Sequence, residues 1–216
     1  QTSDGGFIAA GQIYQGNYAG YVIKADSIGG FVWERYGYND FINSIIPSKQ
    51  GGFIMTGGAD GSNLKVSLIK INSDASIVWS RNYGASLEVG YYVCESTDDG
   101  YGITGVTGSY GAGQGDIYFV KTDSDGSLLW TKSFGTTNDD QGYYIHQTAD
   151  NGYMIAGYIN RLYTPNSNAD IVLIKTDSNG SLLWTHTYGG TNDDLCYSAQ
   201  QTTDGGIVMV GKTASF

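Results

Sequence analysis

The residues that could perform chemistry are few in this sequence, and they are not arranged as a catalytic set. His146 and His186 are the only histidines, and Asp139 is followed directly by Asp140. Neighbouring side chains on a strand point to opposite faces, so this acidic pair is not placed to share one substrate. The sequence contains no nucleophile elbow, zinc-protease motif, CxxC pair or phosphate-binding loop. It therefore predicts a protein that is not an enzyme.

Acidic residues recur just before one strand of each repeated unit described below: Asp40, Glu88, Asp139, Asp140, Asp193 and Asp194. A ring of such carboxylates could hold Ca²⁺, a hard cation that prefers oxygen ligands. Asp140 and Asp194 are the candidate ligands. The alternative is that these residues only cap turns, as Asp often does. No other cofactor is indicated.

Tyrosines form the second group of candidates. Tyr92, Tyr144 and Tyr197 lie on equivalent strands, next to further tyrosines at 91 and 143. A tyrosine has an apolar ring and a polar hydroxyl, which suits the binding of sugars. The alternative is that these rings fill a narrow central channel.

Four tryptophans mark the internal repeat that must position these residues. Trp33, Trp79, Trp130 and Trp184 are separated by 46, 51 and 54 residues, which is the period of a propeller blade. Their apolar neighbours favour packing between blades, with ligand stacking as the alternative. Nine residues before each tryptophan stands a lysine: Lys24, Lys70, Lys121 or Lys175. We expect these lysines to pair with the recurring acids or with turn carbonyls.

Each unit predicts four antiparallel strands, named A to D from the centre outward. The predicted fold class is all-β: a single four-bladed β-propeller over residues 1–216, with four-stranded blades closed by mixing N- and C-terminal strands. The units span 2–47, 48–96, 97–147 and 148–201, with a partial fifth unit at 202–216. Cys94 and Cys196 fall at different repeat positions, which predicts two free thiols.

Segments such as residues 121–130, with the sequence KTDSDGSLLW, resemble the repeats of the pyrroloquinoline-quinone-type propellers. They are still more similar to extracellular β-propeller repeats of bacteria and archaea, which share the Asp-Gly-Gly-aromatic-Ile and Leu-Ile-Lys-x-Asp patterns. The resemblance implies blades over the whole chain but no particular activity, because propellers host many functions. The quinone-dependent enzymes have about twice as many blades, and no cofactor residues carry over to this chain.

The strand count leaves one strand over. Four A strands are expected, at 40–47, 89–96, 141–147 and 195–201, but there are five B strands. If 195–201 joins the N-terminal strands to close a ring, one terminal B strand has no place: Gly6, Phe7, Ile8, Ala9 and Ala10, or Gly206, Ile207, Val208, Met209 and Val210. An unpaired strand invites β-addition to a neighbouring copy. The alternatives are pairing outside the blade and a segment cut from a longer tandem array.

The composition limits the partners. The chain of 216 residues has a net charge of −10, which argues against nucleic acid and anionic membranes. No apolar run approaches the ~20 residues of a spanning helix. The low fraction of charged residues and the abundance of Ser, Thr and Gly are typical of secreted proteins. We therefore expect a secreted structural or adhesive module that assembles with copies of itself into a filament or tandem array by strand donation. The alternative is a glycan-binding, lectin-like propeller.

Overall fold

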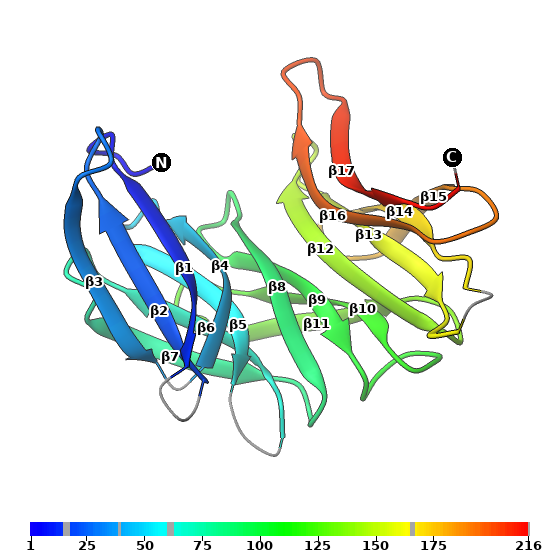
Figure 1. Cartoon of the computed structure of the whole chain (residues 1–216), viewed down its shortest axis with the longest axis horizontal. Helices are drawn as coiled ribbons and strands as arrows, with labels where there is room; N and C mark the ends of the chain where they lie inside the picture. Colours follow the sequence, from blue (N-terminus) through cyan, green and yellow to red (C-terminus); the bar gives the residue numbers. More distant parts are fainter. Residues whose placement is uncertain (15–17, 39, 60–62, 165–166, 216) are drawn as a thin grey trace.

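The chain folds into an open arc of β-sheets (Figure 1). The computed structural model describes residues 1–14, 18–38, 40–59, 63–164 and 167–215. Within these residues there are seventeen strands in five sheets and no helix. Accordingly, no helix of the described residues is long and apolar enough to cross a membrane.

The strands follow the chain order within each sheet, and every pairing inside a sheet is antiparallel. Sheet 1 consists of β1 (Phe7–Tyr14), β2 (Tyr18–Ala25) and β3 (Phe31–Tyr38). Sheet 2 consists of β4 (Asp40–Pro47), β5 (Phe53–Ala59), β6 (Val66–Ile71) and β7 (Ile77–Tyr83). Sheet 3 consists of β8 (Glu88–Glu95), β9 (Tyr101–Thr107), β10 (Asp116–Thr122) and β11 (Leu128–Phe134). Sheet 4 consists of β12 (Asp139–Gln147), β13 (Tyr153–Arg161), β14 (Asp170–Thr176) and β15 (Leu182–Tyr188), and sheet 5 of β16 (Asp194–Gln201) and β17 (Ile207–Thr213).

The all-β prediction is confirmed, and the A-to-D order holds in sheets 2, 3 and 4. The first strands of these sheets and of sheet 5, β4, β8, β12 and β16, contact one another in sequence and line the inner side of the arc. Sheet 1 contains B, C and D strands, and sheet 5 contains A and B strands. The expected excess of one B strand is therefore present among the described residues.

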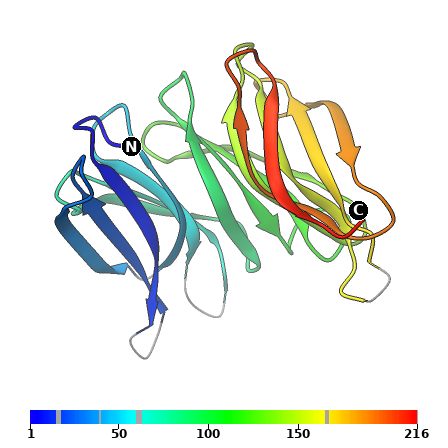
Figure 2. The ribbon, with the colours of Figure 1, turned by 45° about the horizontal axis from the view of Figure 1, so that its top comes forward.

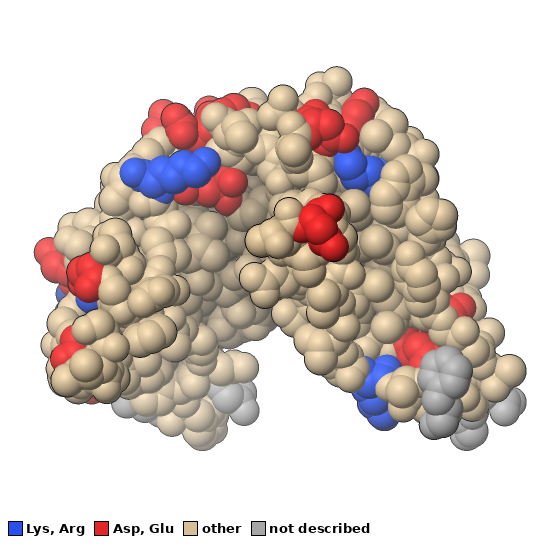
Figure 3. All heavy atoms as spheres, turned by 90° about the horizontal axis from the view of Figure 1, so that it is seen from above, with Lys and Arg blue, Asp and Glu red and all other residues tan. Residues whose placement is uncertain are grey.

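The expected closure of a four-bladed ring is not formed. The segment expected to complete the N-terminal sheet, β16, pairs with β17 along residues 194–201, and β1 pairs with β2. A second view shows sheets 1 and 5 at opposite ends of the arc (Figure 2). Seen from above, the molecule is hollowed between two arms (Figure 3). In the local hairpin β16–β17, the B strand β17 pairs with the A strand of its own unit. Both candidate exchange segments are therefore paired within their own sheets.

Apolar layers between successive sheets hold the arc together. The C strands β6 and β10 are buried along their whole length, as the continuous apolar runs predict when both sheet faces are covered. Each layer combines residues of two sheets; for example, Ile54 and Leu68 of sheet 2 pack with Tyr101 and Ile103 of sheet 3. Alternate residues of β5 thus face the two neighbouring sheets: Phe53 and Met55 pack toward sheet 1, and Ile54 packs toward sheet 3.

The tryptophans lie in these layers, on the D strands. Three of them contact the first residue of the next sheet's B strand. The ring centroids are 6.4 Å apart for Trp33 and Phe53, 6.0 Å for Trp79 and Tyr101, and 6.5 Å for Trp130 and Tyr153. Trp184 differs, because the equivalent position holds Ile207 and the indole remains 37% exposed. The aromatic contacts therefore connect sheets 1 to 4, and sheet 5 lacks the last one.

The repeated lysines pair with a different set of acids from the one expected. Lys24, Lys121 and Lys175 form ion pairs with Asp4, Asp98 and Asp150, which lie in the A–B turn of the same unit. The lysines also donate to turn carbonyls, as expected: Lys121 to Thr122 O, Lys175 to Thr176 O and Lys70 to Gly51 O. Of the recurring acids before the A strands, Glu88 accepts a hydrogen bond from the Thr107 hydroxyl and Asp140 accepts from the backbone of Thr136 and Asn160 instead.

We predict that Trp130→Ala lowers the free energy of unfolding by about 3 kcal/mol or more, since it removes an indole packed between two sheets. Trp184→Ala should cost only about 1 kcal/mol, because its ring is partly in water already. Urea unfolding followed by circular dichroism measures both. Equal losses would contradict the role assigned to the aromatic contact.

A second prediction compares two buried lysines. Lys121 has a carboxylate partner at 2.8 Å, whereas among the described residues Lys70 donates only to a carbonyl, because Gln50 stands where other units have Asp. Lys121→Met should therefore cost about 1–2 kcal/mol of unfolding free energy, and Lys70→Met less than about 0.5 kcal/mol.

The pH dependence distinguishes the pair further. Burial raises the pKa of Asp98, but hydrogen bonds from Lys121 and Gly100 outweigh it, so the net pKa is lowered. The contribution of the pair is complete above the ordinary Asp pKa of about 4 and is lost as the pH falls through the lowered value. The stability difference between Lys121→Met and the unchanged chain should shrink over that range. A constant difference down to pH ~2 would contradict the ion pair.

Candidate functional site

A β-bulge interrupts each A strand at the same repeat position. The pairing register skips one residue between Gly90 and Tyr92, and again between Gly142 and Tyr144; β4 and β16 have equivalent irregularities. The extra residues are Asn43, Tyr91, Tyr143 and Tyr197. A bulge re-aims side chains and is frequent beside functional sites.

Glycine on the B strand permits this bulge. A Cβ added to Gly105 would lie 1.8 Å from the carbonyl oxygen of Val89, so the A strand comes closer to the B strand than any side chain allows. The same contact occurs at Gly57, Gly157 and Gly211. The four equivalent glycines therefore fix the position of the bulge residues.

The bulge tyrosines form a column along the inner side of the arc. The rings of Tyr91 and Tyr143 are parallel, with centroids 4.7 Å apart and an interplanar angle of 2°. Tyr197 meets Tyr143 edge-on at 5.6 Å and is 46% exposed. In sheet 2 the column ends at Asn43, whose side-chain amide donates to Gly90 O at 2.9 Å. Such parallel and edge-on pairs are favourable aromatic geometries.

The three tyrosines predicted to bind a ligand, Tyr92, Tyr144 and Tyr197, occupy two different repeat positions in the structure. Tyr92 and Tyr144 are equivalent and approach each other at 5.0 Å, whereas Tyr197 is equivalent to Tyr91 and Tyr143. Sequence reasoning named the column residues at 91 and 143 only as neighbours. The tripeptides Gly-Tyr-Tyr at 90–92 and 142–144, aligned with Cys-Tyr-Ser at 196–198, carry the signal that separates the two sets.

Two cavities lie beside these tyrosines. One of about 330 Å³ is lined by Asn43, Tyr91, Tyr92, Tyr143, Tyr197 and Ser198. A larger one of about 770 Å³ is bounded by Tyr92, Tyr144, residues 198–203, Val208 and Val210. The larger cavity includes the outer face of sheet 5, which has no neighbouring sheet among the described residues. The smaller cavity belongs to the inner side of the arc.

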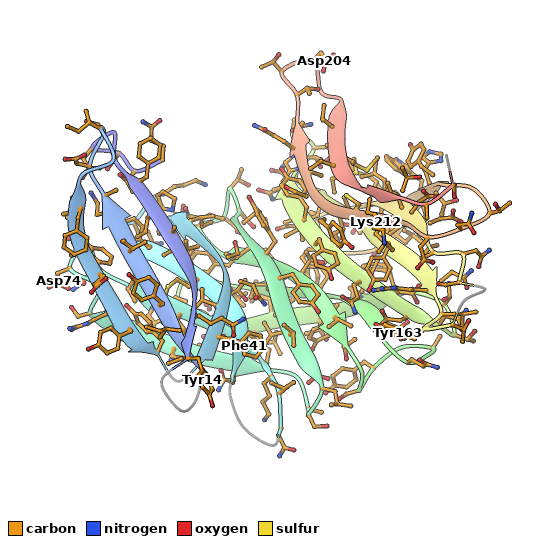
Figure 4. All side chains as sticks on the ribbon, viewed as in Figure 1. Tyr14, Phe41, Asp74, Tyr163, Asp204 and Lys212 are labelled. Carbon is orange, nitrogen blue, oxygen red and sulfur yellow. The ribbon has the colours of Figure 1, made fainter. Side chains whose placement is uncertain are left out.

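A polar network holds Tyr143 in place. Its hydroxyl donates to the side-chain oxygen of Gln141 at 2.8 Å, and the Gln141 amide donates to Asp139 at 3.0 Å. Asp139 is buried and also accepts hydrogen bonds from the hydroxyls of Tyr158 and Tyr163, both at 2.8 Å. Figure 4 shows Tyr163 at the edge of sheet 4.

The Arg161 guanidinium covers this network, 5.6 Å from the Tyr158 ring centroid and 5.0 Å from that of Tyr163. It lies 3.9 Å from Asp193.

Burial raises the pKa of Tyr91, Tyr92 and Tyr143. These hydroxyls are therefore neutral at physiological pH, so the column offers hydrogen-bonding groups but no charge.

The candidate calcium ligands are both engaged in hydrogen bonds. Asp140 accepts from the backbone nitrogens of Thr136 and Asn160, and burial raises its pKa. Asp194 accepts from Gly190 N and the Ser215 hydroxyl. Within the described part of the chain, no three His, Cys, Asp or Glu residues gather as possible metal ligands. The side chain of Asp40 lies outside the described residues, and calcium stays an untested prediction.

The remaining reactive side chains are dispersed. Cys94 and Cys196 are free thiols, and burial raises the pKa of both. His146 shares a hydrogen bond with Gln201 at 2.7 Å, and burial lowers its pKa. His186 lies on β15 beside Trp184, with ring centroids 4.8 Å apart.

Comparisons with known proteins give a fold but no family. No family model matches the chain. It is 26% identical over 125 residues to the regulatory protein FlaEY of Caulobacter vibrioides, a match that covers 53% of this chain and 13% of that protein. It also resembles the crystal structure of a protein of unknown function from Bacteroides caccae, with a TM-score of 0.60 and 13% identity over 94% of this chain and 63% of the other. The chain thus spans less than two thirds of either relative.

Proposed function

We propose that this chain is a structural or adhesive β-propeller segment that associates head to tail with copies of itself. The five sheets are interpreted as propeller blades, because their strands follow the A-to-D order and their A strands line one inner side. The extracellular location, the non-catalytic role and the kinship with extracellular propeller repeats are part of the same proposal. The observation that carries it is that, among the described residues, sheet 5 lacks C and D strands and sheet 1 lacks an A strand, so the two together hold the strands of one complete blade.

The outer face of sheet 5 exposes residues that are buried in every complete sheet. Val208 and Val210 are 59% and 64% exposed, whereas Ile54 and Thr56 at the same positions of β5 are fully buried by sheet 3. At the other end of the arc, Phe7 is 49% exposed, whereas the equivalent Phe53 is 5% exposed. Exposed apolar faces of this kind mark interaction surfaces.

Sheet 4 lacks two partners that sheet 1 can supply. Ile207 holds the repeat position at which the other tryptophans meet an aromatic ring, and Phe7 is the aromatic residue at that position in sheet 1. In sheet 2, Tyr83 donates to Gly126 O in the C–D turn of sheet 3. Sheet 4 finds no such turn in its neighbour, because sheet 5 has no C or D strand in the described residues. The equivalent Tyr188 is 48% exposed, and Gly29 holds the matching turn position in sheet 1.

The A–B turn of sheet 5 is incomplete in the same way. Asp204 occupies the position of the lysine-paired Asp4, Asp98 and Asp150, but within the described part of the chain it accepts hydrogen bonds only from its own turn, at Thr202 and Gly206. Figure 4 shows Asp204 at the tip of the β16–β17 hairpin, away from the other sheets. Sheet 1 carries its own aspartate and lysine, so it can form a complete blade once it gains an A strand.

A composite blade covers Trp184, Tyr188 and Phe7, and it releases β17, which carries Val208 and Val210. In it, β16 of one copy exchanges β17 for β1 of the next copy, which brings the B, C and D strands of sheet 1 into place. The contact is heterologous, so it propagates into a filament unless its rotation closes a ring. Closure within one chain would give the four-bladed ring instead.

Sedimentation and electron microscopy test this proposal. The full chain should form concentration-dependent oligomers or strings, and Phe7→Asp should leave it monomeric, because a charge then occupies the apolar contact. Leu129→Asp is the matched control, since Leu129 is 54% exposed on β11 of a complete sheet. It should assemble like the unchanged chain. A chain that remains monomeric at every attainable concentration would overturn filament formation.

A further inference from the structure

We propose that the smaller inner cavity is a binding site for a neutral saccharide, held between Asn43 and the face of Tyr91. This site lies on the inner side of the arc, and its two main contacts, Asn43 and Tyr91, do not line the larger cavity, although Tyr92 and Ser198 line both. The larger cavity is not part of this proposal, because it is bounded by Val208 and Val210 of β17, the strand that the proposed association displaces.

The lining of the cavity selects for an uncharged ligand. Its six residues are Asn43, Tyr91, Tyr92, Tyr143, Tyr197 and Ser198, none of which carries a charge. This absence contrasts with a chain that has 21 acidic and 11 basic residues. An anion or cation would lose its hydration without gaining a partner there. A neutral ligand with hydroxyl groups would not pay that cost, and amide and hydroxyl side chains can hydrogen-bond to it.

The repeat leaves space for a ring beside Tyr91. Sheets 3, 4 and 5 have tyrosine at the bulge position, but sheet 2 has the shorter Asn43. Among the ring contacts of the described residues, Tyr91 stacks only on Tyr143. A pyranose ring presents an apolar C–H face of suitable size for the remaining tyrosine face. The Asn43 NH₂ group donates to Gly90 O, and no other described residue hydrogen-bonds to its side-chain oxygen, which can therefore serve the ligand.

The site is also rigid before any ligand arrives. Tyr143 supports Tyr91 from behind, and its own hydroxyl is fixed through Gln141 to the buried Asp139. Ordering the aromatic platform therefore costs little entropy on binding. Pockets with aromatic walls and a few fixed polar groups are typical small-molecule sites.

Isothermal titration with neutral hexasaccharides of glucose, mannose and N-acetylglucosamine, and with anionic polygalacturonate, tests the site. At least one neutral sugar should bind, and polygalacturonate should not. Tyr91→Ala should weaken binding at least tenfold, equivalent to about 1.4 kcal/mol. Tyr36→Ala is the matched control, because Tyr36 is 55% exposed on β3 outside the site, and it should bind normally.

Asn43→Tyr keeps the test decisive if Tyr91→Ala is poorly folded. It introduces the residue that the other three A strands already carry, so the fold should be retained while the cavity is filled. Saccharide binding should then be lost with no fall in the thermal midpoint. Failure of every neutral sugar to bind, equal binding of polygalacturonate, or binding that survives Asn43→Tyr would overturn the proposal. Because neither variant alters an end face, oligomer formation should be unchanged in both.

Discussion

The contact between a D-strand tryptophan and the first B-strand residue of the next sheet is the interaction on which the arc depends. Each small sheet has two apolar faces and cannot bury both by itself. The edge-on contacts of Trp33 and Trp130 and the tilted contact of Trp79 fix how one sheet lies on the next. Tyr38 and Tyr83 add a hydrogen bond to the following C–D turn. Where this pattern stops, at Trp184 and at Phe7, the molecule exposes apolar surface.

The inner site depends on the same stacking. The bulge residues meet across sheet boundaries only because successive sheets are held at a repeated spacing, which brings Tyr91 against Tyr143. The B-strand glycines determine where the bulge lies, and the Asp139 network fixes ring orientation. The two proposals therefore use one repeated layer in separate places: association at the ends of the arc, and saccharide binding at its inner edge.

The strand pattern was largely predictable from sequence, because turn residues and the tryptophan period repeat in every unit. The strand observed at Asp40–Pro47 coincides with the expected 40–47, and the surplus B strand was countable. Three features were not predictable. The aspartate partners of the lysines could be identified only once the antiparallel register was known. The bulge made Tyr197 equivalent to Tyr91 and not to Tyr92. Ring closure failed because a local hairpin, β16–β17, competes with a distant pairing to β1. Sequence spacing alone does not decide between the two.

A disulfide test of the composite blade addresses the central claim most directly. If β1 takes the place of β17, the repeat register sets Ala9 of one copy opposite Ala199 of the other, as Met209 is now. In a background with Cys94 and Cys196 changed to alanine, chains carrying only Ala9→Cys are mixed with chains carrying only Ala199→Cys and oxidised. Cysteines on facing strands at this spacing can form a disulfide. The account predicts a cross-linked dimer in the mixture and none in either chain alone. If the mixture forms no cross-link, the account is contradicted. This holds whether or not a chain that carries both changes forms an internal disulfide.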